Sequence, residues 1–168
     1  MNSRPAFTIE KPSFWNPRRE LRDASHGKAG NLVMVSAWSN KAEGEVYGKK
    51  YLFAPKSMWD LRRAVMTDAS GQSVGSAEPK DWWGNTTLSY GGAEYAWKPQ
   101  TWYSGFTLSK GERKIAHVRL GGYFKPGTIE IFEGSEKELL PLLIFAMYYL
   151  QLYINQAAAS GSGGVYTS

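Results

Sequence analysis

Apolar and polar residues alternate in several short stretches of the first 134 residues. In Thr86–Tyr90 the residues Leu88 and Tyr90 are separated by a serine, and Ile129 and Ile131 flank a glutamate. A period of two is typical of antiparallel strands that have one buried face and one solvated face. The clearest strands predicted in this way are Leu32–Val35, Tyr51–Phe53, Thr86–Tyr90, Phe106–Leu108, Ile115–Leu120 and Thr128–Phe132.

Turn signals separate these stretches, and they form a weak repeat. Strand–turn–strand units open at Asp23, Asp68 and Ser109, at spacings of 45 and 41 residues. Asp and Ser initiate turns by hydrogen bonding to the local backbone, and glycine supplies positive φ. The spacing suits a propeller blade, but three copies are fewer than the roughly four to eight blades of a propeller. Further turns are predicted at Asn40–Gly44, Gly91–Gly92, Gly121–Gly122 and Lys125–Gly127.

One uncharged apolar segment, Leu139–Ile154, follows this turn-rich region. Ser135 and Glu138 precede it with the spacing of a capping box, which marks a helix start. Pro141 leaves two starts open, because it would lie past the first turn of that helix or at the first position of a helix beginning near Leu140. We expect a helix over about residues 136–159, ended by Gly161, and a flexible Gly/Ser-rich tail over 160–168.

The predicted helix is apolar on every side, so it belongs inside protein or inside a membrane. A membrane span needs about 20 apolar residues, and this segment has sixteen. Tyr148, Tyr149 and Tyr153 would suit a membrane interface, but no Lys or Arg follows the segment. A core helix is therefore the favoured interpretation, and a C-terminal membrane anchor is the alternative.

A helix with its side chains is about 10–12 Å across, which is too wide for a small barrel already filled by its own side chains. The 134 preceding residues supply roughly twelve strands at about eleven residues per strand and turn. The sequence therefore predicts a mostly β fold, a closed antiparallel barrel of about twelve strands around a C-terminal hydrophobic helix. We expect a single domain over residues 1–159.

This order of elements resembles the tubby-like superfamily, which includes the tubby C-terminal domain, the LURP-one-related proteins and the phospholipid scramblases. The resemblance covers roughly residues 7–158. It implies a twelve-stranded barrel around a terminal helix and a role in phosphoinositide binding or at membranes, and it carries over no ligand residue. The stretches that carry it are Asp68–Gly71, Tyr95–Trp97, Gly111–Ala116, Thr128–Phe132 and Leu139–Ile154.

Composition narrows the chemistry. The chain is 42% hydrophobic and 21% charged, which excludes a disordered tail. It has no cysteine, which excludes disulfides, thiol catalysis and cysteine-ligated metals. Only two histidines, His26 and His117, are present, so we expect no metal and no cofactor. Met1–Phe14 contains no secretory signal, and an intracellular, cytoplasmic protein is expected, at most peripheral at a membrane.

We expect no enzyme activity. Ser73 lies in a G-x-S-x-G pattern (Gly71–Gly75), but a nucleophile elbow needs a following helix, and Ser76–Lys80 predicts none. A Ser73 hydrolase is kept as the remote alternative. His117 has no nameable partner for base chemistry, and solvation in a turn or helix capping explains the paired carboxylates Glu43/Glu45 and Glu136/Glu138.

Basic clusters are the better functional candidates. Arg18–Arg19 with Arg22 is one such cluster, and four tryptophans near the clusters (Trp15, Trp59, Trp82 and Trp83) suit a lipid interface. The competing interpretation is a solvated surface with aromatic side chains filling a wide barrel. The candidate ligands for an anionic headgroup are Lys49, Lys50, Lys56, Arg62, Arg63, Arg113 and Lys114.

Two function classes follow from these features. The first is a non-enzymatic binding module for anionic lipid headgroups at a membrane surface. The second is a structural or interaction subunit of a larger protein assembly. Nucleic acid is not an expected partner, because no recognition motif is present and the net charge of +5 is modest.

Overall fold

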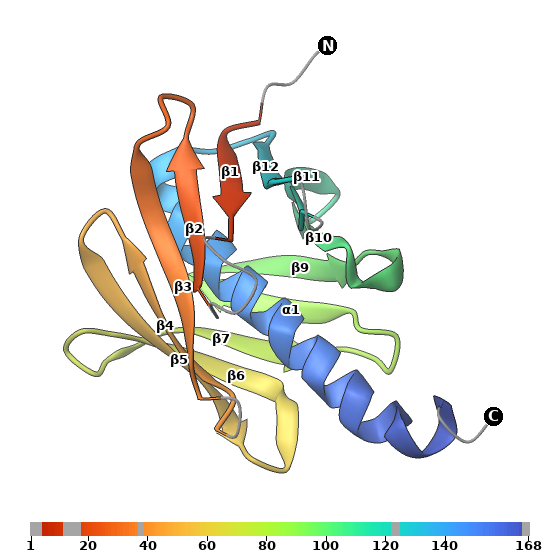
Figure 1. Cartoon of the computed structure of the whole chain (residues 1–168). Coiled ribbons are helices and arrows are strands. Elements are labelled where there is room, and N and C mark those ends of the chain that lie inside the picture. Colours follow the sequence, from red (N-terminus) through yellow and green to blue (C-terminus); the bar gives the residue numbers. More distant parts are fainter. Residues whose placement is uncertain (1–4, 12–17, 37–38, 122–124, 166–168) are drawn as a thin grey trace.

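The computed structural model of the chain describes residues 5–11, 18–36, 39–121 and 125–165 (Figure 1). Twelve antiparallel strands in these residues close into a barrel, and one long helix, α1 (Glu136–Val165), runs through it. Strands adjacent in sequence are paired, and β1 (Phe7–Glu10) pairs with β12 (Gly127–Ile131) to close the ring. The predicted barrel around a C-terminal helix is confirmed.

The other strands follow the chain in up-and-down order, so alternate turns lie at the same end of the barrel. We call the end where α1 begins the entry end and the opposite end the exit end. The strands are β2 (Arg18–Asp23), β3 (Lys28–Ser36), β4 (Lys41–Val46), β5 (Lys49–Ser57), β6 (Asp60–Asp68), β7 (Ser73–Pro79), β8 (Thr86–Tyr90), β9 (Ala93–Pro99), β10 (Gly105–Lys110) and β11 (Arg113–Arg119), and a 3-10 turn, η1 (Thr101–Tyr103), precedes β10.

Each of the six strands predicted most clearly lies within or overlaps an observed strand. The predicted turn at Asn40–Gly44 is placed too far along the chain, because the turn lies at Ser39–Asn40 and β4 already begins at Lys41. Ala42, Gly44 and Val46 are buried and alternate with Glu43 and Glu45. The two glutamates therefore occupy the wetter face of a strand rather than a turn.

The aspartates that open two hairpins act as predicted. Asp23 Oδ1 accepts hydrogen bonds from the backbone N–H of Ser25 and of Gly27, both at 2.9 Å. Asp68 Oδ1 accepts from Ser70 and Gln72 at 2.9 and 3.1 Å. The turn after Ser109 differs, because Ser109 is itself paired with Lys114 inside β10. A two-residue turn, Gly111–Glu112, joins β10 to β11, and Gly111 has φ of +63°.

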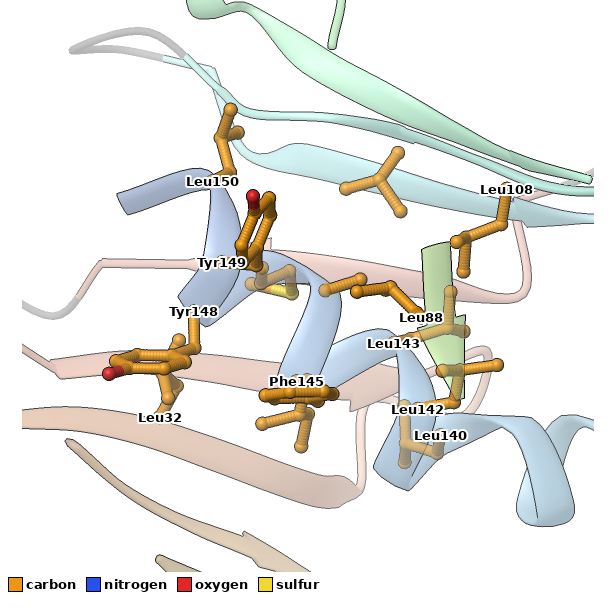
Figure 2. Packing of buried hydrophobic residues seen from close by; sticks show 14 of the residues in the cluster. Leu32, Leu88, Leu108, Leu140, Leu142, Leu143, Phe145, Tyr148, Tyr149 and Leu150 are labelled. Atoms are coloured by element: carbon orange, nitrogen blue, oxygen red, sulfur yellow. The ribbon is translucent and has the colours of Figure 1, made fainter. Parts of the chain in front are cut away.

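The middle of α1 is buried on every side. All residues from Leu140 to Leu150 are buried, and their side chains radiate from the helix toward strands in several directions (Figure 2). Leu88 and Leu108 pack into the same cluster from one part of the barrel, and Leu32 from another. Each large apolar side chain buried in this way contributes about 1.5–3 kcal/mol. The helix is therefore the core that the inward faces of the strands need.

Two glycines let α1 approach the sheet closely. A Cβ at Gly44 would lie 2.6 Å from the Phe53 ring and 3.1 Å from Ile144 of the helix. A Cβ at Gly30 would lie 2.6 Å from a backbone oxygen of β4 and 3.0 Å from Ile144. Phe53 stacks on Phe145 with ring centroids 5.7 Å apart. The small residues of β3 and β4 thus make room for large residues of the helix.

Polar contacts fix the second half of α1 at the exit end. The Tyr148 hydroxyl donates to the backbone oxygen of Asn40 at 2.7 Å, and Asn155 Nδ2 donates to Asn40 Oδ1 at 2.8 Å. The Tyr149 hydroxyl donates to the backbone oxygen of Arg62 at 2.9 Å. Burial raises the pKa of both tyrosines, so both hydroxyls stay protonated.

The helix begins at Glu136, which settles the open question about Pro141. Pro141 lies in the second turn, where it removes one backbone hydrogen bond. The helix ends at Val165, beyond the expected end near residue 159 and inside the segment expected to be a flexible tail. No proline interrupts Ser160–Val165, and a glycine inside a helix costs only about 0.5–1 kcal/mol relative to alanine.

By length and composition, the segment Glu136–Ala158 of α1 would also pass as a membrane span. In this structure 67% of its most apolar window is buried inside the protein. The barrel thus covers most of the surface that an anchor would present to lipid, which supports the core interpretation.

Candidate functional site

The seven basic residues predicted as headgroup ligands are divided between the two ends of the barrel. Lys49–Lys50 open β5 and Arg113–Lys114 open β11, so both pairs lie at the entry end. Lys56 lies near the end of β5 and Arg62–Arg63 near the start of β6, at the exit end. The structure therefore brings together two groups rather than one site.

The entry end carries a hollow of about 640 Å³. Two predicted residues, Lys49 and Arg113, line it together with Lys110 and Lys137, and Glu133 and Glu138 bring two carboxylates to the same walls. Its aromatic lining consists of Tyr47, Tyr51, Tyr90 and Tyr95.

Most cations around this hollow already have partners. Arg113 Nη1 pairs with the carboxylate of Glu133, and Lys110 Nζ lies 5.9 Å from the centroid of the Tyr95 ring. Lys137 lies 5.7 Å from the Tyr47 ring in the same way. Ion pairing and cation–π contact therefore account for much of the positive charge at this end.

Two neighbouring turns at the exit end carry exposed large apolar side chains, Met58, Trp59, Trp82 and Trp83, which we call the tryptophan cluster. Their exposed fractions are 78%, 89%, 90% and 83%. Met58 and Trp59 form the β5–β6 turn, and the other two lie in the β7–β8 turn. The turns are neighbours because β6 pairs with β7, and the Arg62 guanidinium lies 5.2 Å from the centroid of the Trp82 ring.

The two turns are held by side-chain hydrogen bonds. Asp81 Oδ1 accepts from the backbone N–H of Trp83 at 2.8 Å and of Asn85 at 3.2 Å, and its Oδ2 accepts from Asn85 Nδ2 at 2.6 Å. These bonds, led by that from the Asn85 side chain, lower the pKa of Asp81. In the other turn Ser57 Oγ accepts from the backbone N–H of Asp60 at 3.1 Å. The tryptophans are therefore presented on ordered turns.

The three predicted basic residues beside the tryptophan cluster are bound within the protein. Lys56 Nζ lies 2.6 Å from Glu78 Oε1, and Arg63 Nε lies 2.8 Å from Glu78 Oε2. Arg63 also pairs with Asp60, and Arg62 donates to the backbone oxygen of Asp81. The hydrogen bond from Lys56, followed by that from Arg63, lowers the pKa of Glu78. These three predicted ligands are thus committed to contacts within the protein.

The two residues considered for catalysis, Ser73 and His117, lie on different strands. Ser73 is the first residue of β7, and Gly71–Gly75 continues into that strand rather than into a helix. His117 lies on β11, where its buried Nε2 has no hydrogen-bond partner among the described residues, and burial lowers its pKa. Within the described ranges, no group of three or more His, Asp or Glu side chains is arranged to hold a metal ion.

Sequence reasoning named Trp59, Trp82 and Trp83 but did not group them. Asp81-Trp82-Trp83-Gly84 repeats the Asp-x-x-Gly pattern of Asp68–Gly71, and Gly84 has φ of +97°. That pattern alone would have placed two adjacent tryptophans in a turn. Trp15, the fourth tryptophan named, lies outside the described residues.

Comparison of the chain with protein-family models, with curated proteins and with solved structures finds no match in any of the three. The resemblance to the tubby-like superfamily stays a prediction from the order of elements.

Proposed function

We propose that this chain is a non-enzymatic binding module that attaches to the surface of a lipid bilayer through the tryptophan cluster. The carrying observation is the near-complete exposure of three tryptophans and a methionine on two neighbouring ordered turns at one end of the barrel.

Tryptophan suits the membrane interface because its ring is largely apolar while its N–H can still reach water or headgroups. Burying about 150 Å² of apolar ring surface contributes at most about 4 kcal/mol. Several large apolar side chains exposed at one end of a molecule are typical of an interaction site. Projecting turns of this kind can enter the soft surface of a bilayer without a pocket of matching shape, which a protein partner would have to provide.

A flat bilayer meets only one end of the barrel. At the entry end, carboxylate or aromatic partners occupy Arg113, Lys110 and Lys137. At the exit end Lys56 and Arg63 are paired with Glu78, so we assign the binding mainly to insertion of the apolar side chains. The net charge of +5 adds a preference for anionic lipid that salt weakens.

The test is co-sedimentation with vesicles of phosphatidylcholine, alone and with phosphatidylserine. A triple variant, Trp59→Ser with Trp82→Ser and Trp83→Ser, is expected to lower partitioning at least tenfold on both vesicles, a change worth about 1.4 kcal/mol. Leu52→Ser is the matched control, because Leu52 is 50% exposed on β5 but lies outside the tryptophan cluster. It should partition as the original chain does.

Charge reversal separates the two ends. The double variant Lys49→Glu with Lys50→Glu, at the entry end, should change binding to neutral vesicles less than twofold. Loss of binding in this variant would show that the membrane-binding site lies at the basic entry end. The protein-interaction subunit would be favoured instead if the original chain did not bind vesicles but formed an oligomer, and if the triple tryptophan variant were monomeric.

A further inference from the structure

A second feature at the exit end is a crevice of about 180 Å³ between the second half of α1 and strands β2 and β3, beside the ends of β1 and β11. Its walls are mostly apolar, and Arg19, Lys11 and Gln151 supply the polar side chains. We call it the Arg19 crevice. Its apolar lining consists of Leu32, Met34, Leu120, Met147, Leu150 and Ile154.

Arg19 points into the barrel. In β2 the alternate residues Glu20 and Arg22 belong to an outer network, in which Arg22 pairs with Glu10 at 2.8 Å and with Glu20 at 3.2 Å. Leu21, on the opposite face from that network, is fully buried. Arg19 shares the face of Leu21, and it lines the crevice beside apolar residues of the helix.

No carboxylate among the described residues pairs with this guanidinium. The only influence on the pKa of Arg19 is burial, which lowers it, and no hydrogen bond or nearby charge in the described part of the chain opposes that effect. The segments outside the described residues contain no Asp or Glu side chain. An arginine stays charged in proteins, so a half-buried guanidinium without a counter-charge favours an incoming anion.

The shape of the crevice restricts the anion. A cavity of about 150 Å³ holds one benzene molecule, whereas typical ligand pockets begin near 300 Å³. A volume of about 180 Å³ thus accepts part of a single alkyl chain, and two chains would not fit. Arginine binds carboxylate and phosphate through two parallel hydrogen bonds.

We propose that the Arg19 crevice binds a single-chain anionic amphiphile, with its carboxylate or phosphate head on Arg19 and its alkyl chain along Leu32, Met147 and Leu150. The inference does not depend on the tryptophan cluster, because different strands build the two sites. It would stand if the chain failed to bind vesicles.

The test is isothermal titration of the purified full chain with decanoate, decyl phosphate and decanol, each below its aggregation concentration. We expect at least one of the two anions to bind at least tenfold more tightly than decanol. The stronger of the two identifies the head group. Equal affinity for decanol, or no binding of either anion, would overturn the proposal.

Two variants at neighbouring positions complete the test. Arg19→Gln is expected to weaken binding of the preferred anion at least tenfold and to leave that of decanol unchanged. Arg18→Gln alters the adjacent arginine on the outer face, which lies 3.9 Å from Glu20, and should bind as the original chain does. Far-ultraviolet dichroism checks that both variants fold. Undiminished binding by a folded Arg19→Gln variant would contradict the assignment.

Discussion

At the scale of single residues, β2 shows how one side chain can depart from the pattern around it. Its inward positions should be apolar, and Leu21 obeys this rule while Arg19 does not. A charge placed against apolar walls without a counter-charge opposes folding. Arg19 therefore lowers the stability of the ligand-free fold, and binding of an anionic ligand would explain its presence at this position.

The first prediction follows from that cost. Arg19→Met should stabilise the ligand-free protein by about 1 kcal/mol, because a flexible apolar side chain replaces an unpaired charge. The melting temperature should rise by about 2–4 °C in a protein of this size. Arg18→Met on the outer face should change stability by less than about 0.5 kcal/mol. Thermal denaturation followed by dichroism checks both, and a lower melting temperature for Arg19→Met would contradict the account.

The second prediction concerns pH. Burial first, and then the charge of Arg119, lower the pKa of His117 in the folded protein. The unfolded chain therefore takes up a proton first as pH falls through about 6.5, so stability is full above that value and declines below it. His117→Gln removes this contribution. Its melting temperature should fall less between pH 7.5 and pH 5.5 than that of the original chain, and an identical decline would refute the argument.

At the scale of elements, alternation and turn chemistry predicted most of this barrel. Thr86–Tyr90 was found as β8, and the aspartate turns at Asp23 and Asp68 formed the expected bonds. β4 was missed because Asn40 and Gly44 were interpreted as a turn signal, although Ala42 and Gly44 alternate with charged residues as the buried positions of the strand. The grouping of the tryptophans depends on which turns share an end, which only the closed topology reveals.

The third prediction tests how the tryptophans are presented. Asp81→Ala removes the acceptor that orders Trp83 and Asn85, so we expect vesicle binding to weaken about threefold. Asp68→Ala removes the same kind of acceptor from the β6–β7 turn at the entry end. Each variant should lower the melting temperature, because each loses the side-chain acceptor of its turn, but only Asp81→Ala should alter binding. Equal effects on binding would show that turn order at the exit end is irrelevant to it.

At the scale of the whole molecule, barrel and helix depend on each other. The inward faces of the strands have α1 as their core, and α1 is apolar on every side. Met147 is buried in that core, and a charge there would cost several kcal/mol against a total stability of about 5–15 kcal/mol.

The fourth prediction is that Met147→Lys, and deletion of residues 139–168, each yield unfolded or aggregated protein. Near-ultraviolet dichroism of the tryptophans is the measurement. A truncated chain that is soluble and keeps the native tryptophan signal would show that the helix is not the core, and the membrane-anchor interpretation would replace it.

The central claim, that the exit end inserts into lipid, has a direct test because the chain contains no cysteine. Met58→Cys and Lys50→Cys each provide one site for an environment-sensitive fluorophore, at the exit end and the entry end, without removing a tryptophan. On addition of mixed phosphatidylcholine and phosphatidylserine vesicles, the probe at position 58 should shift to the blue and gain intensity, while the probe at position 50 should stay unchanged. A blue shift at position 50 alone, or at neither position, would contradict the proposed orientation on the membrane.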